Sequence, residues 1–220
     1  MQITFETIKQ NERIKTYIRM ADASLQSSGF TEHSFAHVIR TADFSGRLLE
    51  SVGRTKRVQE LGQIAGYLHD IGNIVNRVDH AQSGAIMAFR LLDELKMEPQ
   101  EIATIVSAIG NHDEKTGAPV HDVAAALILA DKSDVRRTRV RNRDISSFDI
   151  HDRVNYAVTN SKLQFAKDST EILLSLSIDT EISPILSYFE IFMERMVLCT
   201  KAAAQLERSF GLMINGQRVL

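Results

Sequence analysis

The stretch Ile64-Ala65-Gly66-Tyr67-Leu68-His69-Asp70-Ile71-Gly72 decides how the chain is interpreted, because His69 and Asp70 interrupt an otherwise apolar run. Ionisable side chains in such a place need a partner that satisfies them. A shared divalent ion satisfies both, since imidazole nitrogen and carboxylate oxygen are good ligands for Fe, Mn, Co, Ni or Zn. Gly66 and Gly72 permit close helix packing and a sharp exit from the helix. The alternative is a core histidine that is hydrogen-bonded to its neighbours.

The residues around this stretch predict helices. Apolar residues recur at helical spacing through most of the first 135 positions. The predicted helices cover about 6–28, 32–52, 55–68, 79–95, 99–112 and 122–135. The doublet therefore stands at the end of the third predicted helix.

The pattern changes in the last third of the chain. Residues 154–178 alternate in polarity around the turn-like Lys167-Asp168-Ser169, which predicts an antiparallel hairpin. Pro184 begins a long predicted helix that runs to about Phe210, and residues 212–219 can supply a further strand. We therefore expect a mainly α chain with a small antiparallel sheet: a helical domain over 1–150 and an α+β extension over 151–220 packed on it.

Composition excludes several classes of protein. The chain has 220 residues, 44% of them hydrophobic and 25% charged, and a net charge of −2, so no global field attracts nucleic acid or an anionic membrane. The single cysteine, Cys199, excludes an internal disulfide and a cysteine-based metal site. The longest apolar run, Val123 to Ala130, is far shorter than the about 20 residues that span a bilayer. Without a recognisable signal peptide, we expect a cytoplasmic protein with no membrane or nucleic-acid partner.

Other candidate ligands stand on other predicted helices. His33 and His37 lie four positions apart and so share a helix face. Asp131 ends an apolar helical turn, where an unpaired carboxylate is costly. His80 opens one helix and His112 ends another. Helical bundles build metal sites in this way, with one or two ligands from each helix. By contrast, the pairs His121-Asp122 and His151-Asp152 begin polar helices and are interpreted as structural caps.

The order His37, His69-Asp70, Asp131 resembles the H…HD…D pattern of the HD superfamily of metal-dependent phosphohydrolases. The surrounding segments HSFAHVIRTADFSGRLLESVG, GQIAGYLHDIGN and AALILADKSD are similar to that family as well, so the resemblance covers roughly residues 30–140. It implies an HD-domain helical bundle in which these four residues bind a divalent metal ion.

His80, in DHAQSGAIMAF, and His112, in IGNHDE, are similar to the extra ligands of the HD-GYP-like branch. That resemblance implies a second ion on these two histidines, with Asp70 bridging both ions. The chain departs from the branch at Asn73, where a lysine is usual, and at Asp113, where a histidine is usual. The GYP signature is missing, which counts against cyclic di-GMP as substrate. We therefore expect one or two ions.

Such a centre activates water for attack on a phosphate ester, either a nucleotide or a small phosphorylated metabolite. The catalytic candidates are Asp70, Lys132 and Asp113, with Glu114 as an alternative acid or base. The phosphoryl charge needs cationic partners. The candidates for binding the substrate are His33, Lys132, Asp134, Arg136 and Arg137. Alternatively, His33 is a ligand or binds nothing, Asp134 supports a ligand from behind, and the basic run from Lys132 to Arg143 is a solvated loop.

Three other functions remain open. The first is a metal-bound module that senses a nucleotide without cleaving it. The second is a di-iron oxygenase, since a few HD-type proteins use mixed-valent iron pairs. The third is a helical interaction protein with coincidental His-Asp pairs. The part after residue 150 is a candidate for homodimerisation or for covering the active site.

Overall fold

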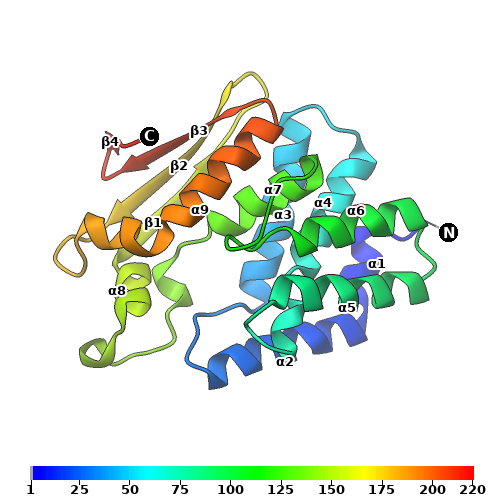
Figure 1. Cartoon of the computed structure of the whole chain (residues 1–220), viewed down its shortest axis with the longest axis horizontal. Helices are drawn as coiled ribbons and strands as arrows, with labels where there is room; N and C mark the ends of the chain where they lie inside the picture. Colours follow the sequence, from blue (N-terminus) through cyan, green and yellow to red (C-terminus); the bar gives the residue numbers. More distant parts are fainter. Residues whose placement is uncertain (1) are drawn as a thin grey trace.

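The computed structural model describes residues 2–220, and the first 132 of these positions are helical apart from short connections (Figure 1). The helices of this part are α1 (Phe5–Gln10), α2 (Glu12–Ser27), α3 (Phe35–Ser51), α4 (Lys56–Leu68), α5 (His80–Glu94), α6 (Pro99–Gly110) and α7 (Asp122–Lys132). A short 3-10 helix, η1 (Ile71–Ile74), follows α4.

Helix α7 lies at the centre of the molecule (Figure 1). Every residue from Val123 to Lys132 is buried, because the run Val123 to Ala130 has no polar face to turn toward solvent. Helices α3, α4, α6 and α9 (Ile185–Gln205) pack around it. The central position of α7 brings its C-terminal Asp131 into the middle of the bundle.

After α7 the chain passes through two 3-10 turns, η2 (Arg137–Arg139) and η3 (Ile145–Ser147), to helix α8 (Ile150–Ala157). A four-stranded sheet follows in the order β1 (Val158–Gln164), β2 (Glu171–Ile178), β3 (Ser209–Ile214), β4 (Gln217–Arg218). Strand β2 alternates buried and half-buried residues, and α9 packs against β2 and β3. The sheet therefore has one face on the core, which agrees with the alternation in its sequence.

The predicted fold class is confirmed: the chain is mainly helical, with an antiparallel β1–β2 hairpin and a long C-terminal helix. The sheet as a whole is mixed, because β3 pairs with β2 in parallel. Helix α9 returns the chain to the end of the sheet where β2 began, so the next strand must run in the same direction. The sequence predicted the antiparallel hairpin and a further strand, but not the parallel direction of that strand.

Two helix boundaries also differ from the prediction. The predicted helix 6–28 is broken at Asn11, whose side chain accepts hydrogen bonds from the amides of Arg13 and Ile14 and so begins α2 anew. Helix α8 replaces the start of the predicted hairpin, since Asp149 caps it through the Asp152 amide. Both differences come from local capping by polar side chains.

The C-terminal part packs on the helical part: Ser161 of β1 donates its hydroxyl proton to the Ser133 carbonyl, 2.6 Å away. The division into a domain 1–150 and an extension 151–220 stays a prediction. Among residues 2–220, no helix is both long and apolar enough to cross a membrane.

Candidate metal centre

The doublet lies where α4 ends. His69 is the C-terminal cap of α4, and Asp70 leads into η1. Gly66 lies one turn earlier, where a Cβ would touch the backbone of Ala42 in α3, so the prediction of close packing at this glycine is confirmed. Gly72 packs even more tightly, because a Cβ there would overlap the backbone oxygen of His80 and the amide nitrogen of Gly84. Two helices thus lie directly against the segment that carries the doublet.

Five helices bring the predicted ligands together. His37 lies on α3, His69 at the end of α4, His80 at the start of α5, His112 just after α6 and Asp131 near the end of α7. The histidines and Asp70 are at most 5% exposed, and Asp131 is 9% exposed. Their nitrogen and oxygen atoms form overlapping groups whose members lie within 4.8 Å of one another. All six predicted ligands therefore belong to one buried cluster.

The first group consists of His37, His69, Asp70 and Asp131. The Nε2 atoms of His37 and His69 are 3.3 Å apart. Asp70 Oδ2 lies 3.1 Å from His69 Nε2 and 3.5 Å from His37 Nε2. Asp131 Oδ1 lies 3.2 Å from His37 Nε2 and 3.7 Å from His69 Nε2. Two imidazoles and two carboxylates thus face one point.

The second group consists of Asp70, His80 and His112. The Nε2 atoms of His80 and His112 are 3.2 Å apart, and Asp70 Oδ1 lies 3.7 Å from His80 Nε2. Asp70 therefore faces the first group with one oxygen and the second with the other. An Arg77 Nη1 atom lies 3.3 Å from His80 Nε2, so a guanidinium stands beside this group.

The hydrogen bonds of the four imidazoles indicate what these groups hold. Each Nδ1 atom donates to an oxygen: His37 to Asp134 Oδ2, His69 to the Gly66 carbonyl, His80 to the Arg77 carbonyl and His112 to the Ile109 carbonyl. With the proton on Nδ1, each ring in its metal-binding, neutral form turns an Nε2 lone pair toward the lone pair of its neighbour. Such pairs need a shared cation between them, and Asp70 Oδ2 is likewise buried without a hydrogen bond. The residues fit a divalent metal ion.

The electrostatics of the first group also favour a cation. Burial alone lowers the pKa of His69, but the charge of Asp70 and the hydrogen bond with Asp131 raise it to about 10. Burial and Arg139 oppose a charge on His37 too, yet contacts with Asp131, Asp134 and Asp70 raise its pKa. Burial raises the pKa of Asp70, but His69 and His33 outweigh it and hold that pKa well below its usual range. The carboxylates remain ionised and attract positive charge.

In the second group, the pKa values of the histidines are lowered instead of raised. Burial, followed by the charge of Arg77, lowers the pKa of His80. Burial, followed by the charges of His69 and His80, holds the pKa of His112 well below its usual value. Both rings are therefore neutral near neutral pH, which is the form that binds a metal ion.

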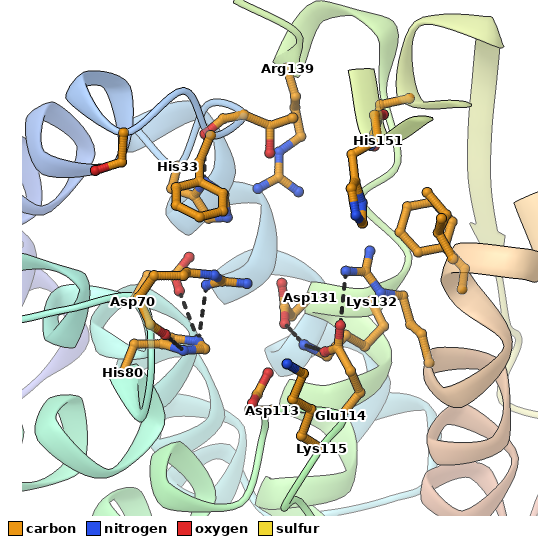
Figure 2. Close-up of a pocket in the computed structure, with 18 of the residues that line it drawn as sticks. His33, Asp70, His80, Asp113, Glu114, Lys115, Asp131, Lys132, Arg139 and His151 are labelled. Carbon is orange, nitrogen blue, oxygen red and sulfur yellow. Dashed lines mark hydrogen bonds and ion pairs between the residues drawn. The ribbon is translucent and has the colours of Figure 1, made fainter. Parts of the chain in front are cut away.

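The cluster opens into a pocket of about 700 Å³, which is large enough for a small organic ligand (Figure 2). Asp70, His80 and Asp131 contribute to its wall, so ligand atoms face the cavity. Lys132 lies beside them, with its Nζ atom 2.8 Å from Asp131 Oδ2 and 2.6 Å from Glu114 Oε2. The predicted Lys132 and Asp113 both line this pocket.

The other predicted substrate-binding residues are divided between the pocket and its surroundings. His33 lines the pocket, and its ring centroid is 5.5 Å from that of His37. Asp134 is fully buried behind His37, where it accepts the Nδ1 proton at 2.8 Å, so it supports a ligand from behind. Burial, followed by the charge of Arg139, lowers the pKa of His33 well below its ordinary value.

Arg136 and Arg137, which were predicted to bind the substrate, are absent from the lining of this pocket. Arg136 forms an ion pair with Asp134, and Arg137 lies over the ring of Tyr156 at 4.5 Å and donates to its carbonyl. Besides Lys132, the basic run contributes Arg139 to the pocket lining, and this residue is 6% exposed. The run is therefore not a uniformly solvated loop.

Several further lining residues were not predicted from the sequence, among them two arginines and a histidine. Arg195 comes from α9, Arg77 from the loop before α5 and His151 from α8. His151 had been assigned to a structural cap, but Figure 2 shows its ring directed into the pocket. The helical periodicity of α9 offered a signal for Arg195, since it lies one turn before the buried Cys199. Nothing in the sequence alone indicates that α9 reaches the metal centre.

Comparison with known proteins places the chain in a family. A search of the curated proteins found no match. Among solved structures, the chain is similar to the crystal structure of a predicted HD superfamily hydrolase from an uncultured Thermotogales bacterium, with 23% identity and a TM-score of 0.46. That match covers 60% of this chain and 73% of the other. The model of the HD domain, a family that binds divalent metal ions, matches residues 34–152, which include all six clustered ligands. The chain therefore belongs to the HD domain family.

Proposed function

We propose that this protein is a metal-dependent phosphohydrolase that cleaves a phosphate ester of a nucleotide or small phosphorylated metabolite. The observation that carries the proposal is the cluster of four imidazoles and two carboxylates beside a pocket with buried cationic side chains. The lone-pair geometry calls for a divalent ion, and the cations suit a phosphoryl group. Membership of the HD domain family supports the same function.

In this proposal, His37, His69, Asp70 and Asp131 hold a first ion, and Asp70, His80 and His112 hold a second. Fe, Mn, Co, Ni and Zn all suit this mixture of imidazole and carboxylate. When bound, such an ion supplies a Lewis acid for the phosphoryl oxygens and lowers the pKa of water. Asp70 belongs to both groups, so it sets the position of one relative to the other.

Lys132 provides a fixed positive charge beside the ligands. Its ammonium group forms ion pairs with Asp131 and Glu114 and carries three protons, one more than these two partners can engage. The third proton is available to a phosphoryl oxygen. Glu114 is held as a carboxylate by Lys132 and Arg195, since their charges overcome burial and keep its pKa well below the usual range. Asp113 is therefore the better candidate for protonating the leaving group.

Metal analysis tests the metal centre. Protein purified without chelators or an affinity tag should contain about one or two equivalents of a divalent transition metal. Asp70→Ala should lose it, because Asp70 faces both groups. Activity against phosphate monoesters and diesters is then measured with added Mn²⁺ or Fe²⁺. Wild-type protein that takes up no metal after anaerobic reconstitution contradicts the proposal and favours an interaction protein.

The same preparation separates the remaining alternatives. Nucleotide binding without turnover favours a sensing module, and dioxygen consumption with an organic substrate favours a di-iron oxygenase. The domain division at residue 150, a homodimer, a cytoplasmic location and the absence of nucleic-acid partners stay predictions. Size-exclusion chromatography with light scattering measures the oligomeric state.

A further inference from the structure

Arg195 is a cation whose charge is only partly balanced. Its side chain is 17% exposed, lines the pocket and lies over the ring of Phe192 at 4.3 Å, which fixes the plane of the guanidinium. Its acidic partner among the described residues is Glu114, with Nη2 and Oε1 3.3 Å apart. The Arg195 Nε atom is buried and has no hydrogen-bond partner.

Glu114 is already engaged by a second cation. Its Oε2 atom lies 2.6 Å from Lys132 Nζ, a closer contact than the one with Arg195. Lys132 also contacts Asp131, but that carboxylate faces the first metal-binding group. One carboxylate therefore serves two cations, and a positive charge remains on this wall of the pocket. A guanidinium that is mostly shielded from water in this way is costly unless a ligand provides the missing anion.

Arg139, from a different part of the chain, is a second cation in the pocket wall whose charge is not balanced by a close carboxylate. Its Nε and Nη1 atoms donate to the carbonyls of Glu32 and Asp134, each at 2.8 Å, and both carbonyls are neutral. The nearest carboxylate oxygen that contacts it, Asp134 Oδ2, is 3.9 Å away and already accepts from His37 and Arg136. Figure 2 shows the guanidinium directed into the pocket. The backbone contacts hold it there without neutralising it.

We propose that Arg139 and Arg195 together clamp the terminal phosphoryl group of the substrate, so that the substrate is a phosphate monoester dianion. The inference rests on the proposed phosphohydrolase function. A terminal phosphoryl group offers three non-bridging oxygens and two charges, enough for two guanidinium groups that each bind in a forked manner. A diester offers two oxygens and one charge, and would leave one buried guanidinium without a counter-charge.

The inference gives the C-terminal part of the chain a function. Arg195 lies outside residues 34–152, the part that matches the HD domain. Helix α9 packs along α7 and so brings this side chain into the same pocket as Asp131. The α+β extension thus contributes to substrate recognition as well as to the core.

Matched esters test the proposal. Hydrolysis of 4-nitrophenyl phosphate and of bis(4-nitrophenyl) phosphate is measured, since both release the same leaving group. We expect wild type to prefer the monoester, and Arg195→Gln to lower kcat/KM for the monoester about 100-fold but for the diester less than about threefold. Arg195→Lys should recover part of the loss. Lys201→Gln, which removes an exposed charge from the same helix, should change neither rate.

A binding experiment separates the clamp from the reaction. Metal-loaded protein is titrated with phenylphosphonate, a stable dianion, and with its monomethyl ester, a monoanion. We expect wild type to bind the dianion at least about tenfold more tightly, and Arg139→Gln or Arg195→Gln to abolish that preference. Metal content and melting temperature are measured for each variant, and any variant that loses metal is replaced by the corresponding lysine variant.

The outcomes distinguish this inference from the proposed function. If neither ester is hydrolysed but the preference for phenylphosphonate depends on both arginines, the phosphohydrolase proposal fails and the clamp stands. If the diester is hydrolysed as efficiently as the monoester, and Arg195→Gln lowers both rates equally, the clamp is wrong while the function stands. Binding of the dianion that is unchanged in both variants also overturns the clamp.

Discussion

The two metal-binding groups have similar imidazole geometry but different charge. In each, two Nε2 atoms face one another, at 3.3 Å in the first group and 3.2 Å in the second, and each receives one oxygen of Asp70. The first group is completed by the carboxylate of Asp131, whereas the guanidinium of Arg77 stands beside the second. Charge next to the histidines, not their number, should therefore set the affinity for metal, and the first group should bind more tightly.

The groups that accept the Nδ1 protons of the histidines also favour tighter metal binding by the first group. His37 donates its Nδ1 proton to the carboxylate of Asp134, whereas His80 and His112 donate to backbone carbonyls. An anionic acceptor makes the opposite ring nitrogen a stronger metal ligand. The pKa shifts agree: the pKa is raised at His37 and lowered at His80 and His112. The following predictions test this difference between the groups.

The largest effect is expected for His69→Ala. It removes a ligand of the first group, so we expect loss of the tightly bound ion and a fall in kcat/KM of about a thousandfold or more, since a bound ion supplies several kcal/mol of transition-state stabilisation. Elemental analysis and steady-state kinetics measure both effects. His69→Gln, which preserves more of the side-chain volume, controls for loss of packing. Retention of the tightly bound ion in both variants would contradict the assignment.

His112→Ala is the matched change in the second group. Both histidines donate Nδ1 to the carbonyl three residues earlier, so the two substitutions disturb similar local structures. We expect His112→Ala to lose only the weaker ion and to lower kcat/KM about 10- to 100-fold. Titration with Mn²⁺, followed calorimetrically, counts the sites. If His112→Ala loses metal as completely as His69→Ala, the two groups are not independent.

Asp134→Asn should lower metal affinity less than the two histidine substitutions, and only at the first group. Asparagine keeps an oxygen for the Nδ1 proton of His37 but removes the negative charge behind the ring. We expect affinity for the first ion to fall about 10- to 100-fold and affinity for the second to be unchanged. Calorimetric titration measures both constants, and the melting temperature of the metal-free protein reports any loss of the ion pair with Arg136. If the affinities for both ions fall equally, the effect of the substitution is not confined to the first group.

Arg77→Gln is expected to change metal affinity least, and to raise it where the other substitutions lower it. Removal of the guanidinium 3.3 Å from His80 Nε2 relieves repulsion of a second ion, so its affinity should rise about three- to tenfold, given a half-exposed charge. Arg90→Gln, an exposed arginine on α5, is the control. An unchanged or weaker second site would mean that Arg77 does not oppose metal binding.

The ligand cluster could be predicted because its residues violate the local pattern. His69, Asp70 and Asp131 are ionisable groups in apolar helical segments, and their order matches a family motif. Helices α3 to α7 were likewise predicted from apolar spacing, because each buries one face, or in α7 the whole surface, against its neighbours. Both inferences depend on properties of short segments.

The pocket wall could not be predicted because it depends on how distant segments pack. Arg137 and Arg139 stand two positions apart in one basic run, yet only Arg139 lines the pocket, since its backbone pairs with Glu32 across the chain. Arg195 reaches the pocket because α9 packs along α7. The periodicity of α9 puts Arg195 on the same face as the buried Cys199, but it does not say which helix that face contacts. The parallel pairing of β3 depends on the same helix.

Gly72 determines how far apart the two metal-binding groups lie. Its backbone lies directly against that of α5, with no side chain between the segment that carries Asp70 and the helix that begins with His80. The separation of the groups is therefore set by contact between two main chains, which is less compressible than contact between side chains. A Cβ at position 72 would overlap the backbone of His80 and Gly84, so a larger residue there requires the two segments to move apart. We therefore expect Gly72→Ala to weaken metal binding at the second group more than at the first.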